Sequence, residues 1–223
     1  MKFGMANLWL FFSPSATLWV YSWVGLHSIS GESGHFMIVL RPLYACRHNN
    51  KAVLGRWGLV PAQTRPDYLP KALKLPTSNA RWETANERYS FRNAWSKKQR
   101  CIVPAESIFE PDWRTGKSIP TRFTRSDGAP IAVAGLWDAY KNEAGQWEFS
   151  YTMLTMNADD HPLFKHYHRE GKEKRMVLIL PEESYEGWLD GEDAAKFFRP
   201  FEPEKLIARP AGEEQQRTAL VGQ

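Results

Sequence analysis

SNARWET at residues 78–84 and RCIVPAESIFE at residues 100–110 are the two stretches around which this sequence is organised. The first places an amide, a guanidinium and a carboxylate within five residues, at Asn79, Arg81 and Glu83. The second ends an apolar run with an acid, Glu110. Binding and catalytic groups favour loops held by a rigid scaffold, so these short polar clusters predict strand ends that converge on a site.

The amide of Asn79 is suited to orienting a substrate group. The planar fork of Arg81 is suited to gripping a phosphate, because it matches the geometry of an oxyanion. The alternative for both residues is structural: an ordinary turn hydrogen bond for Asn79, and a buried ion pair between Arg81 and Glu83.

Glu110 follows two apolar residues and precedes Pro111. This setting predicts a partly buried carboxyl with a raised pKa, as an acid-base catalyst needs, although a solvated acid at a strand end fits the pattern equally well. His168 is followed by Arg169 in the most basic segment of the chain, so its imidazole could act on a phosphate-bearing substrate. The alternative for His168 is a loop histidine in water.

The chain has 223 residues, enough for one domain with a proper core. Its 43% hydrophobic and 24% charged residues are typical of a soluble globular protein. A formal net charge of +4 permits a polyanionic partner without requiring one, because a solvated basic surface explains it as well.

The two cysteines, Cys46 and Cys101, form neither a disulfide framework nor a zinc site, so we expect a reducing compartment, the cytoplasm. Three histidines lie close together at positions 161, 166 and 168, but no thiol or regular carboxylate spacing accompanies them. We therefore expect no metal and no cofactor.

Residues 3–26 contain no charged side chain and seven aromatic ones, and Lys2 precedes them. Such a run has the length of a membrane span and begins like a signal peptide. Serine, threonine and proline interrupt it, so we expect no membrane association. The alternative is a leader that is not the native start, produced by a misassigned start codon or frame. We therefore divide the chain into an atypical leader at residues 1–50, a core domain at 51–198 and a loosely ordered tail at 199–223.

Apolar runs bounded by turn residues predict strands at residues 36–40, 99–110, 131–137, 149–156 and 175–180. Helices are expected at residues 83–98, for about three turns, and at 181–189. A turn is predicted at residues 142–145, and Trp57, alone in an apolar strand, is expected to pack in the core. This order of elements predicts an α+β fold dominated by strands.

Several motifs resemble those of the SRAP family (SOS response-associated peptidases, or abasic-site processing proteins). They are GRWGLVP at 55–61, NARWET at 79–84, FRNAW at 91–95, RCIVPAE at 100–106 with the acid at 110, and His168–Arg169 ahead of Arg175–Met176. The likeness runs from about residue 55 to about residue 189. It implies a curved, barrel-like sheet with peripheral helices.

The resemblance also implies roles for the candidate residues. Asn79, Glu110 and His168 would line the active site, and Arg81, Arg169 and Arg175 would bind DNA. The implied function is abasic-site processing in single-stranded DNA by a monomer, through a covalent protein–DNA adduct and with an associated autopeptidase activity, in the DNA-damage (SOS) response.

The sequence departs from the family at the nucleophile. SRAP proteins use a cysteine directly after the initiator methionine, whose amine and thiol condense with the abasic-site aldehyde to an imine and then a thiazolidine. Here Met1 is followed by Lys2, and Cys101, inside a predicted strand, is expected to be buried and inert. Two expectations stay open: a true start elsewhere with Met-Cys, or a catalytically inactive member that only binds single-stranded DNA.

Overall fold

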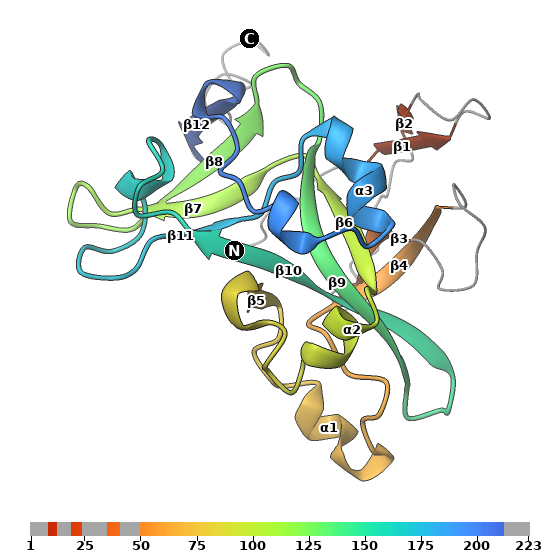
Figure 1. Ribbon diagram of the computed structural model, residues 1–223. Coiled ribbons are helices and arrows are strands. Elements are labelled where there is room, and N and C mark those ends of the chain that lie inside the picture. Colours follow the sequence, from red (N-terminus) through yellow and green to blue (C-terminus); the bar gives the residue numbers. More distant parts are fainter. Residues whose placement is uncertain (1–8, 13–18, 24–34, 41–49, 212–223) are drawn as a thin grey trace, which may run out of the picture.

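The structure, a computed structural model, describes residues 9–12, 19–23, 35–40 and 50–211 (Figure 1). Its largest unit is a seven-stranded sheet of β11 (Arg175–Val177), β10 (Trp147–Asn157), β4 (Lys51–Trp57), β3 (His35–Leu40), β6 (Arg100–Ala105) and β9 (Ile131–Lys141), with β5 (Asn79–Arg81) against β10. Strand β9 pairs with both β6 and β10, so the sheet curls back on itself. The predicted α+β fold with a curved, barrel-like sheet is confirmed.

A second sheet has three strands in the order β12 (Leu206–Pro210), β8 (Ile119–Arg125) and β7 (Ile108–Asp112). Two further strands, β1 (Trp9–Phe12) and β2 (Trp19–Trp23), pair antiparallel with each other and lie within the uncharged run at residues 3–26. In the described part of the chain, no helix is long and apolar enough to cross a membrane.

The helices are short and lie outside the sheets (Figure 1). The α-helices are α1 (Leu69–Ala72), α2 (Arg92–Ser96) and α3 (Tyr185–Leu189). The 3-10 turns are η1 (Pro66–Tyr68), η2 (Trp82–Thr84), η3 (Phe164–His166), η4 (Glu182–Ser184), η5 (Ala194–Lys196) and η6 (Pro203–Lys205).

The core lies inside the curled sheet and beneath α3. Strand β9 is buried along most of its length, and Trp188 of α3 is fully buried with its Nε1 donating to the Cys101 carbonyl at 2.9 Å. The Cys101 thiol is free and fully buried, and this burial raises its pKa, so the expected burial is confirmed. Gly135 permits the close approach of β9 to its neighbours, because an added Cβ would lie 2.7 Å from the Thr152 carbonyl oxygen and 2.9 Å from the Cys101 Sγ.

Several local predictions were wrong. The predicted helix at 83–98 consists of η2 and the five-residue α2, separated by turns. The predicted strand at 99–110 breaks at Glu106 and Ser107, where the chain leaves the large sheet as β6 and enters the small sheet as β7. Trp57, expected in the core, is 39% exposed at the end of β4.

The strands predicted at 36–40, 131–137 and 149–156 are confirmed as β3, β9 and β10, and the turn at 142–145 joins the last two. The strand predicted at 175–180 is regular only in β11, and Ile179 adds a single bridge to Val133. The helix predicted at 181–189 is formed by η4 and α3. Within the segment predicted as a loosely ordered tail, β12 pairs with β8, so the ordered chain extends beyond residue 198.

Candidate functional site

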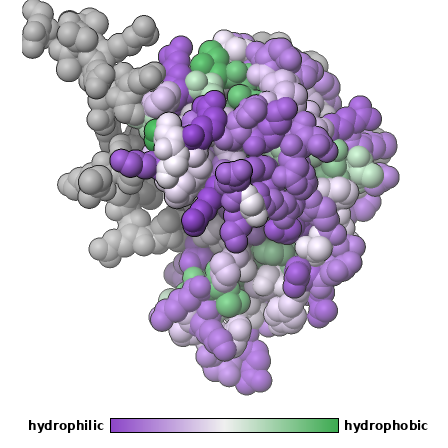
Figure 2. All heavy atoms as spheres, turned by 90° about the vertical axis from the view of Figure 1, so that its left-hand side faces the viewer, coloured by the Kyte–Doolittle hydropathy of each residue, from purple (hydrophilic) through white to green (hydrophobic). Residues whose placement is uncertain are grey.

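The candidate site lies where the end of β7 meets the loop that precedes β11. An antiparallel bridge joins Asp112 to Tyr167, and the backbone N–H of His168 donates to the Pro111 carbonyl at 2.9 Å. Figure 1 shows the end of β7 and this loop together at the left of the molecule. The same side of the molecule, seen face on, is largely hydrophilic (Figure 2), which suits a polar ligand.

Glu110 and His168 form the centre of the site. The Nε2 atom of His168 lies 3.2 Å from Oε2 of Glu110, and their side chains are 23% and 16% exposed, respectively. Burial raises the pKa of Glu110 to about 7. The predicted partly buried acid with a raised pKa is therefore confirmed, and at neutral pH this carboxyl is populated in both its protonated and its ionised form.

His168 has an unusual backbone conformation, with φ at 66°. Left-handed φ values are uncommon for residues other than glycine and cost roughly 1–3 kcal/mol, so they persist only where surrounding contacts impose them. Lys174 Nζ supplies such contacts by donating to the His168 carbonyl at 3.0 Å and to the Arg169 carbonyl at 2.9 Å. His168 Nε2 also lies 2.8 Å from the Arg175 carbonyl oxygen.

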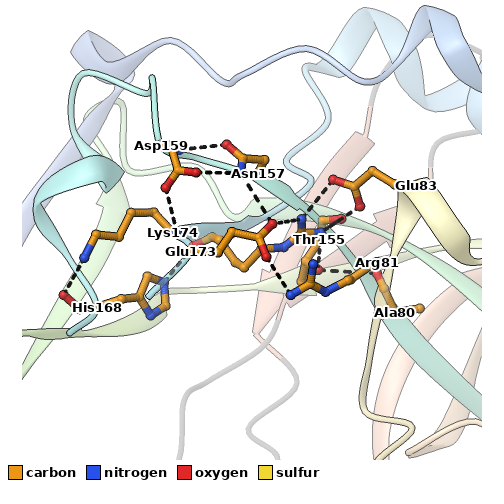
Figure 3. Close-up of polar contacts among 10 residues, drawn as sticks. Ala80, Arg81, Glu83, Thr155, Asn157, Asp159, His168, Glu173 and Lys174 are labelled. Carbon is orange, nitrogen blue, oxygen red and sulfur yellow. Dashed lines mark hydrogen bonds and ion pairs between the residues drawn. The ribbon is translucent and has the colours of Figure 1, made fainter. Parts of the chain in front are cut away.

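An ion-pair network extends the site along β11 and β10 (Figure 3). Arg175 Nη1 contacts Glu83 at 2.9 Å and Glu173 at 2.8 Å, and its Nη2 donates to Glu83 at 2.9 Å and to the Thr155 carbonyl at 2.8 Å. Arg81 Nη2 lies 2.7 Å from Glu173. The alternative of a buried pair between Arg81 and Glu83 was therefore wrong, since Glu83 pairs with Arg175.

The network also shifts the titration of its acids. Partial burial of Glu83 opposes its ionisation, but hydrogen bonds from Arg175 and from the backbone outweigh this effect and lower the pKa of Glu83. A hydrogen bond from Arg175 lowers the pKa of Glu173. Both carboxylates are thus held ionised beside the two arginines.

The three predicted DNA-binding arginines differ in how much of each side chain is exposed to solvent. Arg81 keeps 55% of its side chain exposed, whereas that of Arg175 is only 15% exposed. Arg169 is exposed, and its guanidinium lies 5.8 Å from the ring of Trp113, just beyond the end of β7.

Asn79 lies on β5 two residues before Arg81, so both side chains project from the same face of that strand. It is exposed, and its side chain makes no hydrogen bond with any other residue that the structure describes. The structure therefore brings Glu110 and His168 into contact, and the Arg175 carbonyl contacts His168. Glu173 in turn pairs with both Arg175 and Arg81. Asn79 makes no direct contact with this group.

The sequence prediction missed Glu173 and Lys174. Both lie in the charged run REGKEKR at residues 169–175, which is typical of a solvated loop, and nothing in its spacing indicates that a lysine turns back onto backbone carbonyls.

The described ranges contain no group of three or more histidine, cysteine, aspartate or glutamate side chains arranged to hold a metal ion. Both ring nitrogens of the buried His161 are occupied, since Nδ1 accepts from the backbone N–H of Leu163 and Phe164 and Nε2 lies 2.9 Å from the Phe201 carbonyl oxygen. Cys46 lies outside the described residues.

Two solved structures are similar to this chain. A protein from Bordetella bronchiseptica is 54% identical, with a TM-score of 0.73, and the match covers 79% of this chain and 83% of that one. A protein from Bacteroides thetaiotaomicron is 24% identical, with a TM-score of 0.69 over 83% of this chain and 77% of that one, which supports the fold alone.

Two curated relatives are longer than the region that they share with this chain. A Gallus gallus protein named abasic site processing protein HMCES is 28% identical over 172 residues, which is 66% of this chain and 49% of that protein. A Saccharomyces cerevisiae protein named abasic site processing protein YMR114C is 30% identical over 149 residues, which is 65% of this chain and 36% of that protein. The chain therefore spans about half or less of the curated relatives it matches.

The family model described as SOS response associated peptidase (SRAP) matches residues 27–216. The match begins ahead of the core boundary expected at residue 51 and continues past the one expected at residue 198. It includes β3 to β12, both sides of the Glu110–His168 contact and the arginine network. The chain belongs to the SRAP family.

Proposed function

We propose that this chain processes abasic sites in single-stranded DNA through a covalent protein–DNA adduct, in the DNA-damage (SOS) response, with an associated autopeptidase activity. The observation that carries the proposal is the contact between Glu110 and His168, in which burial raises the pKa of the carboxyl to about 7. Support also comes from the family and from the names of the curated relatives.

The proposed chemistry is condensation with an aldehyde. An abasic deoxyribose in its ring-opened form presents an aldehyde carbon at C1′. A protein amine adds to this carbon, the carbinolamine loses water to give an imine, and a neighbouring thiol adds to the imine carbon to close a thiazolidine. One water leaves and no electrons are transferred to or from another reactant, so the sequence needs only proton transfers.

Glu110 and His168 are suited to those transfers. A carboxyl with a pKa near neutrality can protonate the departing hydroxyl group and then accept a proton again, and an imidazole can take the proton that the attacking amine releases. The family resemblance assigns the amine and the thiol to one N-terminal cysteine. The buried Cys101 has no access to DNA, and Cys46 lies outside the described residues.

The test compares one abasic strand with the matched intact strand. After incubation with the chain and denaturation, a band that migrates as protein plus DNA is expected only with the abasic strand. Cys46→Ala and Cys101→Ala variants identify the thiol. If both variants keep the band, neither cysteine supplies the reacting thiol. Binding of both strands in a native gel with no denaturation-resistant band would instead support a non-catalytic single-strand binder.

Arg81→Ala is expected to weaken binding to single-stranded DNA and to lower the slope of log K against log salt by about one unit, the signature of one lost phosphate contact. The exposed pair with Glu173 contributes roughly 0–1 kcal/mol, so a phosphate can replace that carboxylate at small cost. Arg65→Ala is the matched control, because it removes the same charge from an exposed pair with Asp67. An unchanged slope for Arg81→Ala would leave Arg81 with a purely structural role.

A further inference from the structure

The hydrogen-bond partners of His168 determine which ring nitrogen carries the proton. A backbone carbonyl oxygen only accepts hydrogen bonds, and the Arg175 carbonyl lies 2.8 Å from Nε2. In the neutral ring the proton is therefore on Nε2, and Nδ1 carries the free lone pair.

This assignment separates Glu110 from His168 as proton carriers. An Nε2 that donates to a carbonyl cannot accept a proton from the Glu110 carboxyl, which lies 3.2 Å away. The ionised carboxylate can share the Nε2 proton, but the protonated carboxyl must direct its own proton to another acceptor. Glu110 and His168 consequently act as two separate groups at one substrate, and the atom of His168 that accepts a proton is Nδ1.

This arrangement depends on the loop at residues 168–174. The strained φ of 66° at His168 needs compensating contacts, and Lys174 donates from one ammonium to two successive carbonyls, those of His168 and Arg169. Figure 3 shows the Lys174 side chain extending to the backbone of His168, on the opposite side of Glu173 from Arg81.

Lys174 is itself well anchored. Its backbone N–H donates to Asp159 Oδ1 at 2.9 Å, and its carbonyl accepts from Ala158 N–H at 2.9 Å. The next residue is Arg175, whose carbonyl faces His168 and whose side chain is fixed by the network. Lys174, whose ammonium holds the loop, and Arg175, whose carbonyl selects the tautomer, are thus adjacent in the chain.

We propose that Lys174 is a positioning residue: its ammonium closes the loop at 168–174 and holds His168 with the Nε2 proton on the Arg175 carbonyl, so that Nδ1 accepts the proton from the substrate. The tautomer and the clamp are properties of the free protein. Only the final step, proton transfer from the substrate, rests on the proposed function.

The first test is long-range ¹H–¹⁵N NMR of the imidazole in the DNA-free protein, with His168→Gln used to assign the resonance. At a pH where the ring is neutral, Nε2 of His168 is expected to show the shift of a protonated nitrogen and Nδ1 that of an unprotonated one. The opposite tautomer in the wild-type protein would overturn the proposal, whether or not the chain processes abasic sites.

The second test compares three variants of the loop. Lys174→Met is expected to give a mixture of tautomers and to slow adduct formation roughly 10–100-fold at saturating DNA, as misplacement of a catalytic group does. Lys174→Arg, which keeps the charge and the donors, should restore most of the wild-type tautomer. Lys172→Met is the matched control, because it removes the same charge from an exposed lysine of the same loop.

These variants also separate the clamp from general stability. Lys174→Met with an unchanged tautomer and an unchanged thermal midpoint would show that the ammonium does not hold His168. Should Lys174→Met fail to fold, Lys174→Gln provides the comparison. A further outcome is that the tautomer responds as expected while neither the wild type nor any variant forms an adduct. In that case the positioning role stands and the proposed function fails.

Discussion

Glu110→Gln is expected to slow formation of the adduct by about 10²–10⁴-fold, the range for loss of a general acid or base, while binding to single-stranded DNA changes little. The amide has nearly the same shape as the carboxyl but neither takes nor gives up a proton near neutral pH. Single-turnover rates should be measured from pH 5 to pH 9. The wild-type profile should bend near pH 7, where the Glu110 carboxyl titrates, and this bend should vanish in the variant.

The control for this substitution is Glu143→Gln, at an exposed acid in the turn between β9 and β10. It makes the same chemical change away from the contact with His168 and should leave both rate and profile intact. A Glu110→Gln variant that reacts at the wild-type rate with the wild-type pH profile would remove Glu110 from the acid-base chemistry.

The same substitution should change how stability depends on pH. The pKa of Glu110 is about 7 in the folded protein and about 4.5 for an exposed glutamate, so the folded state binds the proton more tightly. Protonation of Glu110 contributes roughly 3 kcal/mol to the free energy of unfolding. This contribution is fully present below about pH 4.5 and is lost as the pH rises through about 7. Thermal midpoints at pH 5 and pH 8 should therefore differ less in Glu110→Gln than in the wild type.

The elements that the sequence predicted correctly are those with strong local signals. Strands β9 and β10 are long apolar runs joined by a turn with Asn142 and Gly145, so their positions follow from composition alone. The helix expected at 83–98 was wrong because Phe91 is buried from a turn, whereas Tyr89, which the helical pattern placed on the same apolar stripe, is 59% exposed. Tertiary packing has replaced helix periodicity in this segment.

The candidate site was predictable only in part. The apolar neighbours of Glu110 in sequence left burial and solvent exposure equally open, and the structure shows burial. The choice of ion-pair partners depends on strand register. Strand β5 runs parallel to β10 with Arg81 opposite Thr155, and β11 runs antiparallel to it with Arg175 opposite Asn157. Non-local pairing of this kind leaves no signal within a single segment, and neither does the Lys174 clamp, which requires a positive φ at His168.

Arg175→Met is expected to lower the free energy of unfolding by roughly 2–4 kcal/mol. Removing one partner of a buried ion pair costs about 3–5 kcal/mol, and the lower figure here reflects the one-third exposure of Glu83 and Glu173, which lets water solvate them. For a chain of this length each kcal/mol corresponds to about 2–4 °C in the thermal midpoint, so a decrease of about 5–15 °C is expected by calorimetry.

The variant also decides between two roles for Arg175. Both terminal nitrogens of its guanidinium already donate within the protein, and Nε is buried with no hydrogen-bond partner among the described residues. A DNA phosphate would have to displace Glu83 or Glu173 to reach it. Arg81, with its exposed side chain, has no such obstacle, so Arg81→Ala is the matched control and should leave the thermal midpoint within a few degrees.

Arg175→Lys sharpens the comparison, because lysine keeps the charge but cannot bridge two carboxylates and a carbonyl with a planar fork. If Arg175 holds the site together, Arg175→Lys should recover only part of the lost stability, and the tautomer of His168 should change with it, since the Arg175 carbonyl is the acceptor for Nε2. If Arg175 is instead a phosphate contact, Arg175→Met should keep the wild-type thermal midpoint and lower the salt slope of DNA binding by about one unit, and Arg175→Lys should restore that slope. The first result would make Arg175 a positioning residue of the Glu110–His168 site, and the second would return it to the DNA-binding role that the sequence predicted.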